Sequence, residues 1–290
     1  MPSTTEHDSI SAVLATATRR LTGVSDSARL DAEILLARSI NMPRSYLFAH
    51  PEETLDETAL QRLTETINRR LNGEPMAYIT GVKEFWSLDL LVTPATLVPR
   101  PETELLVDLA LREIPRDASW QILDLGTGNG AIAVAIARER PCCDITAVDA
   151  SGEALAVAMQ NTRRLDLPNV TCIEGDWAVP VADRSFRVIV SNPPYVGDSD
   201  TALDALRAEP DLALASGPDG LDAIRRLARD CMPIIDNDGL LILEHGNEQQ
   251  DAVAEILGSN GWRDIACFDD YAGTPRVTSA RRRASHHDHD

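Results

Sequence analysis

The segment Asn192-Pro193-Pro194-Tyr195 contains residue types that can hold a planar amino group. It follows an apolar run, residues 187–191, that predicts a buried strand. Two successive prolines cannot continue a central strand, because each fixes φ and lacks an N–H donor. The Asn192 side-chain oxygen and the Pro193 carbonyl can each accept one hydrogen from an NH2 group, and the Tyr195 ring can pack on its flat face. The segment therefore predicts a holder for a carboxamide or an exocyclic amine.

A glycine-rich loop at residues 126–130 forms a second candidate site. It lies between a predicted strand at 121–125 and a predicted helix at 131–140, where glycines let the backbone turn sharply and approach a ligand closely. The spacing is GxGxG rather than the GxGxxG of dinucleotide loops, and Asp124 precedes it. A carboxylate there would repel a pyrophosphate. It would favour a cationic ligand such as a sulfonium or an amino group.

Two further acids follow the next predicted strands. Asp149 ends the strand at 145–149, about 20 residues past the loop, where a carboxylate can accept hydrogen bonds from both ribose hydroxyls. Asp176 and Trp177 follow the strand at 170–174 and supply an acid and an aromatic ring near an adenine. Carboxylates at three successive strand ends together predict S-adenosyl-L-methionine as the cofactor, with S-adenosyl-L-homocysteine as its product.

The chemistry predicted from these two sites is methyl transfer to nitrogen. An amide nitrogen is a poor nucleophile, so the site must mainly place that nitrogen in line with the sulfonium methyl. Well-oriented intramolecular reactions gain roughly 7–11 kcal/mol from such positioning. Proton loss can follow the transfer, so no general base is assigned. The predicted catalytic residues are Asn192, Pro193 and Tyr195, and Pro194 joins them in binding the substrate.

The second half of the sequence alternates between strand and helix patterns. The predicted strands are 121–125, 145–149, 170–174, 187–191, 239–244, 264–268 and 276–279. The helical patterns between most of them are 131–140, 152–165, 221–232 and 248–260. This alternation predicts an α/β fold, a doubly wound and mostly parallel seven-stranded sheet of the Rossmann-like type.

The first half reads differently. Residues 1–75 show helical periodicity without a strand signal and predict a small helical domain, whose second helix is expected to bury Leu30, Ile34 and Leu35. Residues 76–98 have a strand-like composition that predicts a β-hairpin linker. Residues 99–280 are then the catalytic domain, and the low-complexity end, 281–290, is predicted to be a disordered tail.

Composition restricts the class of protein. The chain has 290 residues, and its 27 Lys+Arg against 46 Asp+Glu give a formal charge of −19. A surface this acidic repels phosphate backbones, so no direct nucleic-acid partner is expected. The N-terminus lacks the basic and apolar regions of an export signal, and the five cysteines show no CxxC pair. A cytoplasmic protein without a membrane partner or a metal site is predicted.

Several motifs carry a resemblance to a known family. They are Gly73-Glu74-Pro75, 80–86, 97–104, 124–130, 192–195 and 243–246. They make the chain resemble the HemK/PrmC protein-glutamine methyltransferases over nearly its whole length. That family N5-methylates the glutamine of the Gly-Gly-Gln motif in class-1 peptide chain release factors. The resemblance therefore implies this activity, a release factor as partner, and N-terminal helices that help grip it.

The same resemblance implies roles for individual residues. Asn192, Pro193 and Tyr195 would hold the glutamine side chain, and the signature at 99–104 would shape the wall of the site. The full set of implied or predicted cofactor residues is Asp124, Gly126, Thr127, Gly128, Asn129, Gly130, Asp149, Asp176, Trp177 and Asn192. One segment departs from the family pattern, because 196–208 is short and Ala208 stands where an aromatic residue usually precedes Glu209-Pro210.

Three other functions remain open at this stage. A sister enzyme that modifies a ribosomal-protein glutamine would carry the same catalytic motifs. An N6-adenine nucleic-acid methyltransferase would also suit the segment at 192–195, although the net charge counts against it. A catalytically silent binding protein is the third alternative, and the intact Asp124, Asp149 and Asn192 count against that one.

Overall fold

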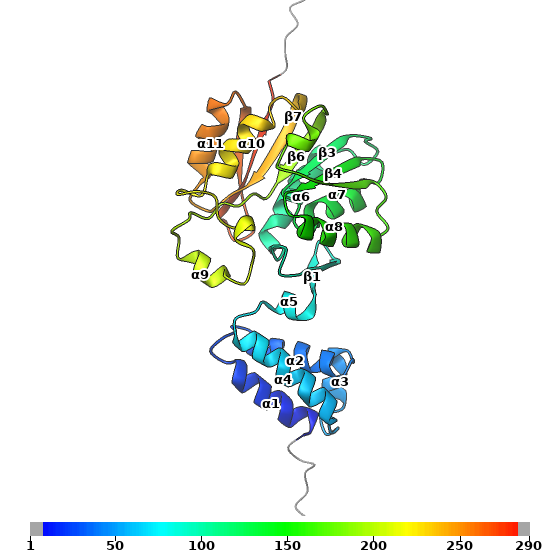
Figure 1. Ribbon diagram of the computed structural model, residues 1–290. Coiled ribbons are helices and arrows are strands. Elements are labelled where there is room, and N and C mark those ends of the chain that lie inside the picture. Colours follow the sequence, from blue (N-terminus) through cyan, green and yellow to red (C-terminus); the bar gives the residue numbers. More distant parts are fainter. Residues whose placement is uncertain (1–7, 284–290) are drawn as a thin grey trace, which may run out of the picture. The chain divides into compact units, whose positions relative to one another are not determined.

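The computed structural model describes residues 8–283, which divide into two compact units between Gly81 and Val82. The unit up to Gly81 is helical (Figure 1). Its helices are α1 (Ile10–Leu21), α2 (Ala28–Ser39), α3 (Arg44–Ala49), α4 (Glu57–Leu71) and α5 (Met76–Thr80). The cap residues Ser9 and Asp56 accept hydrogen bonds from backbone N–H groups in the first turns of α1 and α4. Leucine and isoleucine side chains from α1, α2 and α4 fill the core of this unit.

Two predictions about this unit are wrong. Leu30 was predicted to be buried, but it is 41% exposed. Helix α2 buries the face formed by Ala32, Leu35 and Leu36. Leu30 lies two positions before Ala32 and therefore points roughly 200° away from it around the helix axis. Residues 76–80 form helix α5 instead of a strand. An apolar run of this length cannot be assigned to strand or helix by its periodicity. The short helix α3 was not predicted.

The larger unit contains, within the described residues, a seven-stranded sheet with the order β5-β4-β3-β6-β7-β9-β8. Its strands are β3 (Gln121–Leu125), β4 (Asp144–Asp149), β5 (Val170–Glu174), β6 (Phe186–Ser191), β7 (Ile235–Glu244), β8 (Arg263–Asp269) and β9 (Pro275–Arg281). The pairs from β5 to β7 are parallel, and β9 runs antiparallel to both of its neighbours. This sheet confirms the predicted α/β fold.

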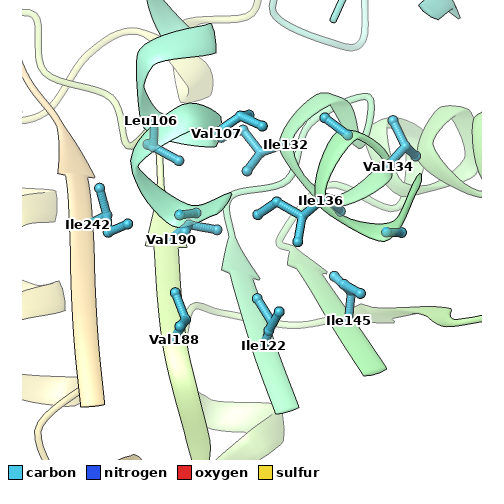
Figure 2. Close-up of a cluster of buried hydrophobic side chains, with 14 of the residues drawn as sticks. Leu106, Val107, Ile122, Ile132, Val134, Ile136, Ile145, Val188, Val190 and Ile242 are labelled. Atoms are coloured by element: carbon cyan, nitrogen blue, oxygen red, sulfur yellow. The ribbon is translucent and has the colours of Figure 1, made fainter. Parts of the chain in front are cut away.

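Helices cover both faces of the sheet. They are α6 (Glu104–Glu113), α7 (Ala131–Glu139), α8 (Gly152–Arg164), α10 (Asp222–Asp230) and α11 (Gln250–Ser259). Figure 2 shows Leu106 of α6 and Ile136 of α7 above Ile122, Val188 and Ile242 of the sheet. Strand residues of the opposite parity pack against α10 and α11 on the other face. The strands are therefore buried on both sides, as their apolar composition predicts.

The predicted hairpin exists as β1 (Val82–Phe85) paired antiparallel with β2 (Leu88–Leu91). It packs into the larger unit, since Phe85 and Leu90 are buried in the same cluster as α6 and α7. Asn161 of α8 fixes its end by accepting from Leu91 N at 2.7 Å and donating to Leu91 O at 3.1 Å. The hairpin is thus a fixed part of this unit, beyond the linker role predicted for it.

The chain after β6 holds two shorter elements, α9 (Ala202–Leu206) and the 3-10 turn η3 (Asp211–Ala213). Two other 3-10 turns precede β6: η1 (Pro101–Thr103) and η2 (Val179–Val181). Helix α9 was not predicted. At the other end, Arg281 belongs to β9 and pairs with Leu240, so the predicted tail does not begin there. Residues 284–290 of that predicted tail lie outside the described residues.

Candidate active site

A cavity of about 390 Å³ opens at the carboxyl ends of β3, β4, β5 and β6. Strand β3 has β4 on one side and β6 on the other, so the chain connections diverge there. Ligands of open α/β sheets bind at such a switch point. The predicted site residues that line the cavity are Gly126, Thr127, Gly128, Asn129, Asp149, Asp176, Trp177, Asn192 and Pro194. Asp124, Gly130, Pro193 and Tyr195 do not line it.

The loop after β3 is shaped by its own backbone. Gly126 has φ of 72°, and a Cβ there would lie 3.5 Å from the Trp177 ring. Gly126 N and Thr127 N both donate to Val148 O, at 2.9 and 3.0 Å. Gly130 has φ of 85° and is the N-cap that precedes α7, and a Cβ there would lie 3.2 Å from the Ala158 Cβ. The loop therefore has glycine where the chain turns left-handed or packs closely.

The Asp149 carboxylate is held in a fixed position at the cavity. Its Oδ2 accepts from Gly128 N at 2.7 Å and its Oδ1 accepts from Ser151 N at 2.9 Å. These two bonds fix the carboxylate at the end of β4. Each carboxylate oxygen has a further lone pair to offer. Because Asp149 lines the cavity, those lone pairs are available to a ligand's hydroxyl groups.

Asp124 lies behind the glycine loop and does not line the cavity. It is fully buried, and its Oδ2 accepts from Thr127 Oγ1 at 2.6 Å and from Ala133 N at 3.2 Å. Burial raises the pKa of Asp124 to about 7. Its Oδ1 has no hydrogen-bond partner within residues 8–283. The predicted direct contact with a cationic ligand is therefore absent from this arrangement, and Asp124 instead connects β3, the loop and α7.

The third acid is also engaged by the protein. Asp176 forms two hydrogen bonds with the Arg226 guanidinium of α10, at 2.9 and 2.6 Å. Trp177 has φ of 53°, and its ring lies beside Gly126. Both residues line the cavity, so Trp177 supplies an aromatic wall while Arg226 holds Asp176. The sequence did not indicate that Arg226 would pair there.

The side of the cavity around Asn192 begins where β6 ends. Ser191 Oγ donates to Leu125 O at 2.6 Å, which joins the ends of β6 and β3. Asn192 then lines the cavity, and its Nδ2 donates to Thr103 Oγ1 at 3.2 Å. Its Oδ1 has no partner within residues 8–283. Pro193 is buried, and the Tyr195 hydroxyl donates to Glu244 Oε1 at 3.4 Å, behind the cavity wall. Burial raises the pKa of Tyr195.

Two residues of this cluster were missed as site residues. Thr103 is 3% exposed and Glu244 is 1% exposed. Burial raises the pKa of Glu244 to about 7, although the nearby Thr103, Arg276 and Tyr195 side chains act in the opposite direction. Both residues stand in segments noted in the sequence, Thr103 in 99–104 and Glu244 in 243–246. Pattern alone gave no reason to bring those segments together.

The signature at 99–104 also fixes the segment that departs from the family pattern. Glu209 is buried; it forms an ion pair with Arg100 and accepts from Val98 N at 3.0 Å. Pro210 and Leu212, which follow Glu209, line the cavity. Arg100 therefore holds one wall of the site through Glu209, in agreement with the structural role expected of this signature.

His245 has a structural environment, since its ring nitrogens bond Gly246 O at 2.8 Å and Thr278 Oγ1 at 2.9 Å. Within residues 8–283, no three His, Cys, Asp or Glu side chains are grouped so that they could hold a metal ion. Over the same residues, no helix has both the length and the apolar character needed to cross a membrane.

The parallel sheet, the glycine loop after β3 and the carboxylate after β4 define a Rossmann-like methyltransferase. Comparison with known proteins agrees: the family described as "Methyltransferase small domain" matches residues 102–209, and "PrmC N-terminal domain" matches residues 12–81. A crystal structure of a methyltransferase from Pyrococcus furiosus superimposes with a TM-score of 0.54 at 19% identity, covering 76% of this chain and 99% of that one. That likeness supports the fold.

Sequence relatives identify the family. The chain is 44% identical to the release factor glutamine methyltransferase of Coxiella burnetii, over 91% of this chain and 95% of that protein. It is 47% identical to the Pseudomonas aeruginosa protein of the same name, over 88% and 92% of the two chains. The corresponding Escherichia coli protein is 42% identical, over 89% and 93%. The chain belongs to the release factor glutamine methyltransferase family.

Proposed function

We propose that this protein transfers a methyl group from S-adenosyl-L-methionine to the side-chain amide nitrogen of the glutamine in the Gly-Gly-Gln motif of a class-1 peptide chain release factor. The observation that carries the proposal is the orientation of Asn192 at the cavity wall. Its Nδ2 is committed to Thr103, so its Oδ1 is the atom left to accept a hydrogen from a substrate NH2 group. The names of the sequence relatives support the same substrate.

The donor side of the cavity fits the proposed cofactor. Asp149 would accept from the ribose hydroxyls, and Trp177 would pack beside the adenine, with Gly126 allowing close approach. When bound, this cofactor supplies an electrophilic methyl on a sulfonium. The residues of the chain need only hold the two reactants so that the amide nitrogen lies in line with the methyl group. Such positioning by itself accelerates a reaction between two bound groups.

The side of the cavity around Asn192, here called the acceptor side, would orient the substrate amide. Asn192 Oδ1, which lies at the cavity wall, would accept one hydrogen of the glutamine NH2 and so orient the amide nitrogen toward the donor. Pro193 and Tyr195, which do not line the cavity, would support the wall behind Asn192 instead of making the direct contacts predicted from the sequence. The proton lost after transfer goes to water, so the reaction needs no general base in the site. A cytoplasmic location follows from the proposed substrate, because release factors act on the ribosome.

One alternative substrate shares this chemistry. A glutamine of a ribosomal protein presents the same amide, and the residues around Asn192 would hold it equally well. The names of the relatives, which specify release factors, favour the first substrate. An adenine amine of a nucleic acid is disfavoured by the net charge of −19.

Transfer of an isotopically labelled methyl group to a panel of acceptors tests the proposal. The panel contains a class-1 release factor, the same factor with its motif glutamine replaced by glutamate, total ribosomal proteins, and an adenine-containing oligonucleotide. Label in the unaltered release factor alone is expected. Label in the glutamate variant, in a ribosomal protein or in the oligonucleotide instead would overturn the proposed substrate.

A further inference from the structure

Asn161 of α8 forms a buried connection between two segments that line the cavity. One segment is the glycine loop, of which residues 126–129 line the cavity, and the other is 94–97, which follows the end of β2. Asn161 is 1% exposed and does not line the cavity itself. It is 32 residues from Asn129 and 70 residues from Leu91, so it joins parts of the chain that are distant in sequence.

Both ends of the Asn161 amide have backbone partners. Its Oδ1 accepts from Leu91 N at 2.7 Å, and its Nδ2 donates to Leu91 O at 3.1 Å and to Asn129 O at 2.9 Å. Asn129 adds a second bond between the same segments, because its Nδ2 donates to Leu91 O at 3.2 Å. A backbone N–H only donates and a backbone carbonyl only accepts, so these partners also fix the orientation of the Asn161 amide.

We propose that Asn161 is a positioning residue for the methyl donor: it holds the end of β2 against the glycine loop and so fixes the two segments of the cavity lining relative to each other. This inference rests on the proposed function for the identity of the donor, and it deepens that function by adding a residue outside the cavity. Asn161 acts through Leu91 and Asn129 and makes no contact with the donor. Its distant bonds complete a donor side whose carboxylates are held mostly by neighbours in sequence.

The connection reaches the cavity through a short length of chain. Leu91 is three residues before the segment 94–97. The turn between them is closed by Thr96, whose N and Oγ1 donate to Thr93 O at 3.0 and 3.1 Å. On the other side, Asn129 is itself a cavity residue. A shift of Leu91 relative to Asn129 therefore changes the lining of the cavity.

Burial makes these bonds costly to lose. Because Asn161 is almost fully exclude from solvent, water cannot take its place, and removal of its amide leaves backbone groups of Leu91 and Asn129 with fewer partners. A cavity whose lining is fixed before the ligand arrives binds more tightly than one that the ligand must order. The loss of the Asn161 amide should therefore weaken donor binding in addition to lowering stability.

Asn161→Leu removes the amide and keeps a side chain of similar size. We expect the Kd for S-adenosyl-L-homocysteine, measured by calorimetry, to rise roughly 10- to 100-fold, as the loss of one or two supporting hydrogen bonds would cause. Asn169→Leu is the matched control, because Asn169 Nδ2 also donates to backbone carbonyls outside the cavity lining, those of Ala137, Arg140 and Cys143. Both variants should lower Tm, but Asn169→Leu should keep the wild-type Kd. A wild-type Kd in Asn161→Leu, or an equal rise in both variants, would overturn the inference.

Amide hydrogen exchange in the wild type provides a second measurement, which serves even if Asn161→Leu does not fold. Leu91 does not line the cavity, so a bound ligand does not cover its amide. The Leu91 N–H is bonded to Asn161 Oδ1, and its exchange requires that bond to open. We expect S-adenosyl-L-homocysteine to slow exchange at Leu91 as well as at Gly128 in the loop. Slower exchange at Gly128 with no change at Leu91 would contradict the inference.

These outcomes separate the inference from the proposed function. If the wild type binds S-adenosyl-L-homocysteine but methylates no release factor, the proposed substrate fails, while a raised Kd in Asn161→Leu and slowed exchange at Leu91 still support the inference. If the wild type does not bind this ligand, the cofactor and the role of Asn161 both fail. If the wild type methylates a release factor and Asn161→Leu has the wild-type Kd, only the inference fails.

Discussion

The two halves of the cavity are built in different ways. On the donor side, most of the bonds that fix the carboxylates join residues close in sequence: Ser151 and Asp149 are 2 apart, Thr127 and Asp124 are 3 apart, and Gly128 and Asp149 are 21 apart. The exception is Asp176, which is 50 residues from Arg226. On the acceptor side, Asn192 and Thr103 are 89 apart, and Val98 and Glu209 are 111 apart. The donor side is thus mostly a product of local motifs, whereas the acceptor side depends on the completed fold.

This difference has a functional meaning. The shape of a glycine loop and a strand end is determined by residues close to them in sequence. The same arrangement can therefore bind the same ligand in different proteins of one fold. The groups proposed to orient the substrate come from η1, β6 and β7, and their relative positions depend on the packing of α6 against the sheet. Substitutions on the two sides should therefore affect different measurable quantities.

The largest expected effect belongs to Asn192→Ala. Removal of the amide at the reacting centre should lower the rate of methyl transfer by about 100- to 1,000-fold, the size seen when a polar group at a reaction centre is lost. Donor affinity, measured by calorimetry, should stay within a few fold of the wild type, because the bonds that fix Asp149 and the glycine loop remain. Asn260→Ala, on an exposed asparagine after α11, is the matched control and should match the wild type. Loss of donor binding together with activity would show that the two sides are not separable.

Asp149→Ala should instead weaken donor binding and leave the rate of methyl transfer at saturating donor nearly unchanged. Loss of a charge-assisted hydrogen bond costs about 1.5–3 kcal/mol, so the donor Kd should rise by roughly 10- to 100-fold. At saturating donor, kcat should stay close to the wild-type value. Asp144→Ala alters an exposed acid at the other end of β4 and serves as the control. An unchanged donor Kd in Asp149→Ala would remove the ribose role from this residue.

Glu209→Ala should act mainly on stability. It leaves Arg100 and Val98 N without their acceptor, which costs about 1–3 kcal/mol of unfolding free energy when such groups are buried. For a unit of this size, each kcal/mol lowers Tm by roughly 2–4 °C. Differential scanning calorimetry measures this shift. Asp211→Ala, two residues further and exposed, should leave Tm unchanged; a Tm for Glu209→Ala equal to the wild type would show that the pair does not hold the wall.

The smallest expected effect is a pH dependence of stability. Burial raises the pKa of Asp124 and of Glu244 from their ordinary values of 3.8 and 4.5 to about 7. Between pH values of about 4 and about 7, these two groups bind more protons in the folded state than in the unfolded state. Their contribution to the free energy of unfolding therefore falls as pH rises through this range. Asp124→Asn should make that fall shallower.

Denaturant titrations at a series of pH values measure this slope. All four tryptophans, Trp86, Trp120, Trp177 and Trp262, follow Gly81 in the sequence, so their fluorescence reports on the larger unit. Carboxylates whose pKa is lowered, such as Asp230, act in the opposite direction in both proteins and cancel in the comparison. Parallel slopes for the wild type and Asp124→Asn would contradict the role given to burial.

The contrast between the two halves also explains how far the sequence could predict the molecule. Alternating strand and helix patterns predicted the seven strands, since their apolar runs and the turns between them are local signals. Leu30 was placed in the core wrongly, because α2 carries apolar residues on more than one face. Residues 76–80 were too few for their period to separate helix from strand.

The site residues that local sequence patterns indicate were predicted, and those that only the tertiary fold brings together were not. The glycine loop, Asp149 and Trp177 were predicted and do line the cavity. Asp124 was expected to face the ligand, but the loop folds over it, and no local pattern reports which side of a turn a carboxylate occupies. Thr103 was missed as the partner of Asn192, and Glu244 as the partner of Tyr195, because only the tertiary fold brings these residues together.

The central claim is that Asn192 orients a release-factor glutamine for methylation. Peptide-resolved mass spectrometry tests it most directly, on a purified class-1 release factor incubated with S-adenosyl-L-methionine and either the wild-type protein or Asn192→Ala. We predict a mass increase of one CH2 unit, confined to the glutamine of the Gly-Gly-Gln peptide, with the wild type and almost none with the variant. No increase with a wild-type protein that binds the donor, or an equal increase with both proteins, would contradict the account.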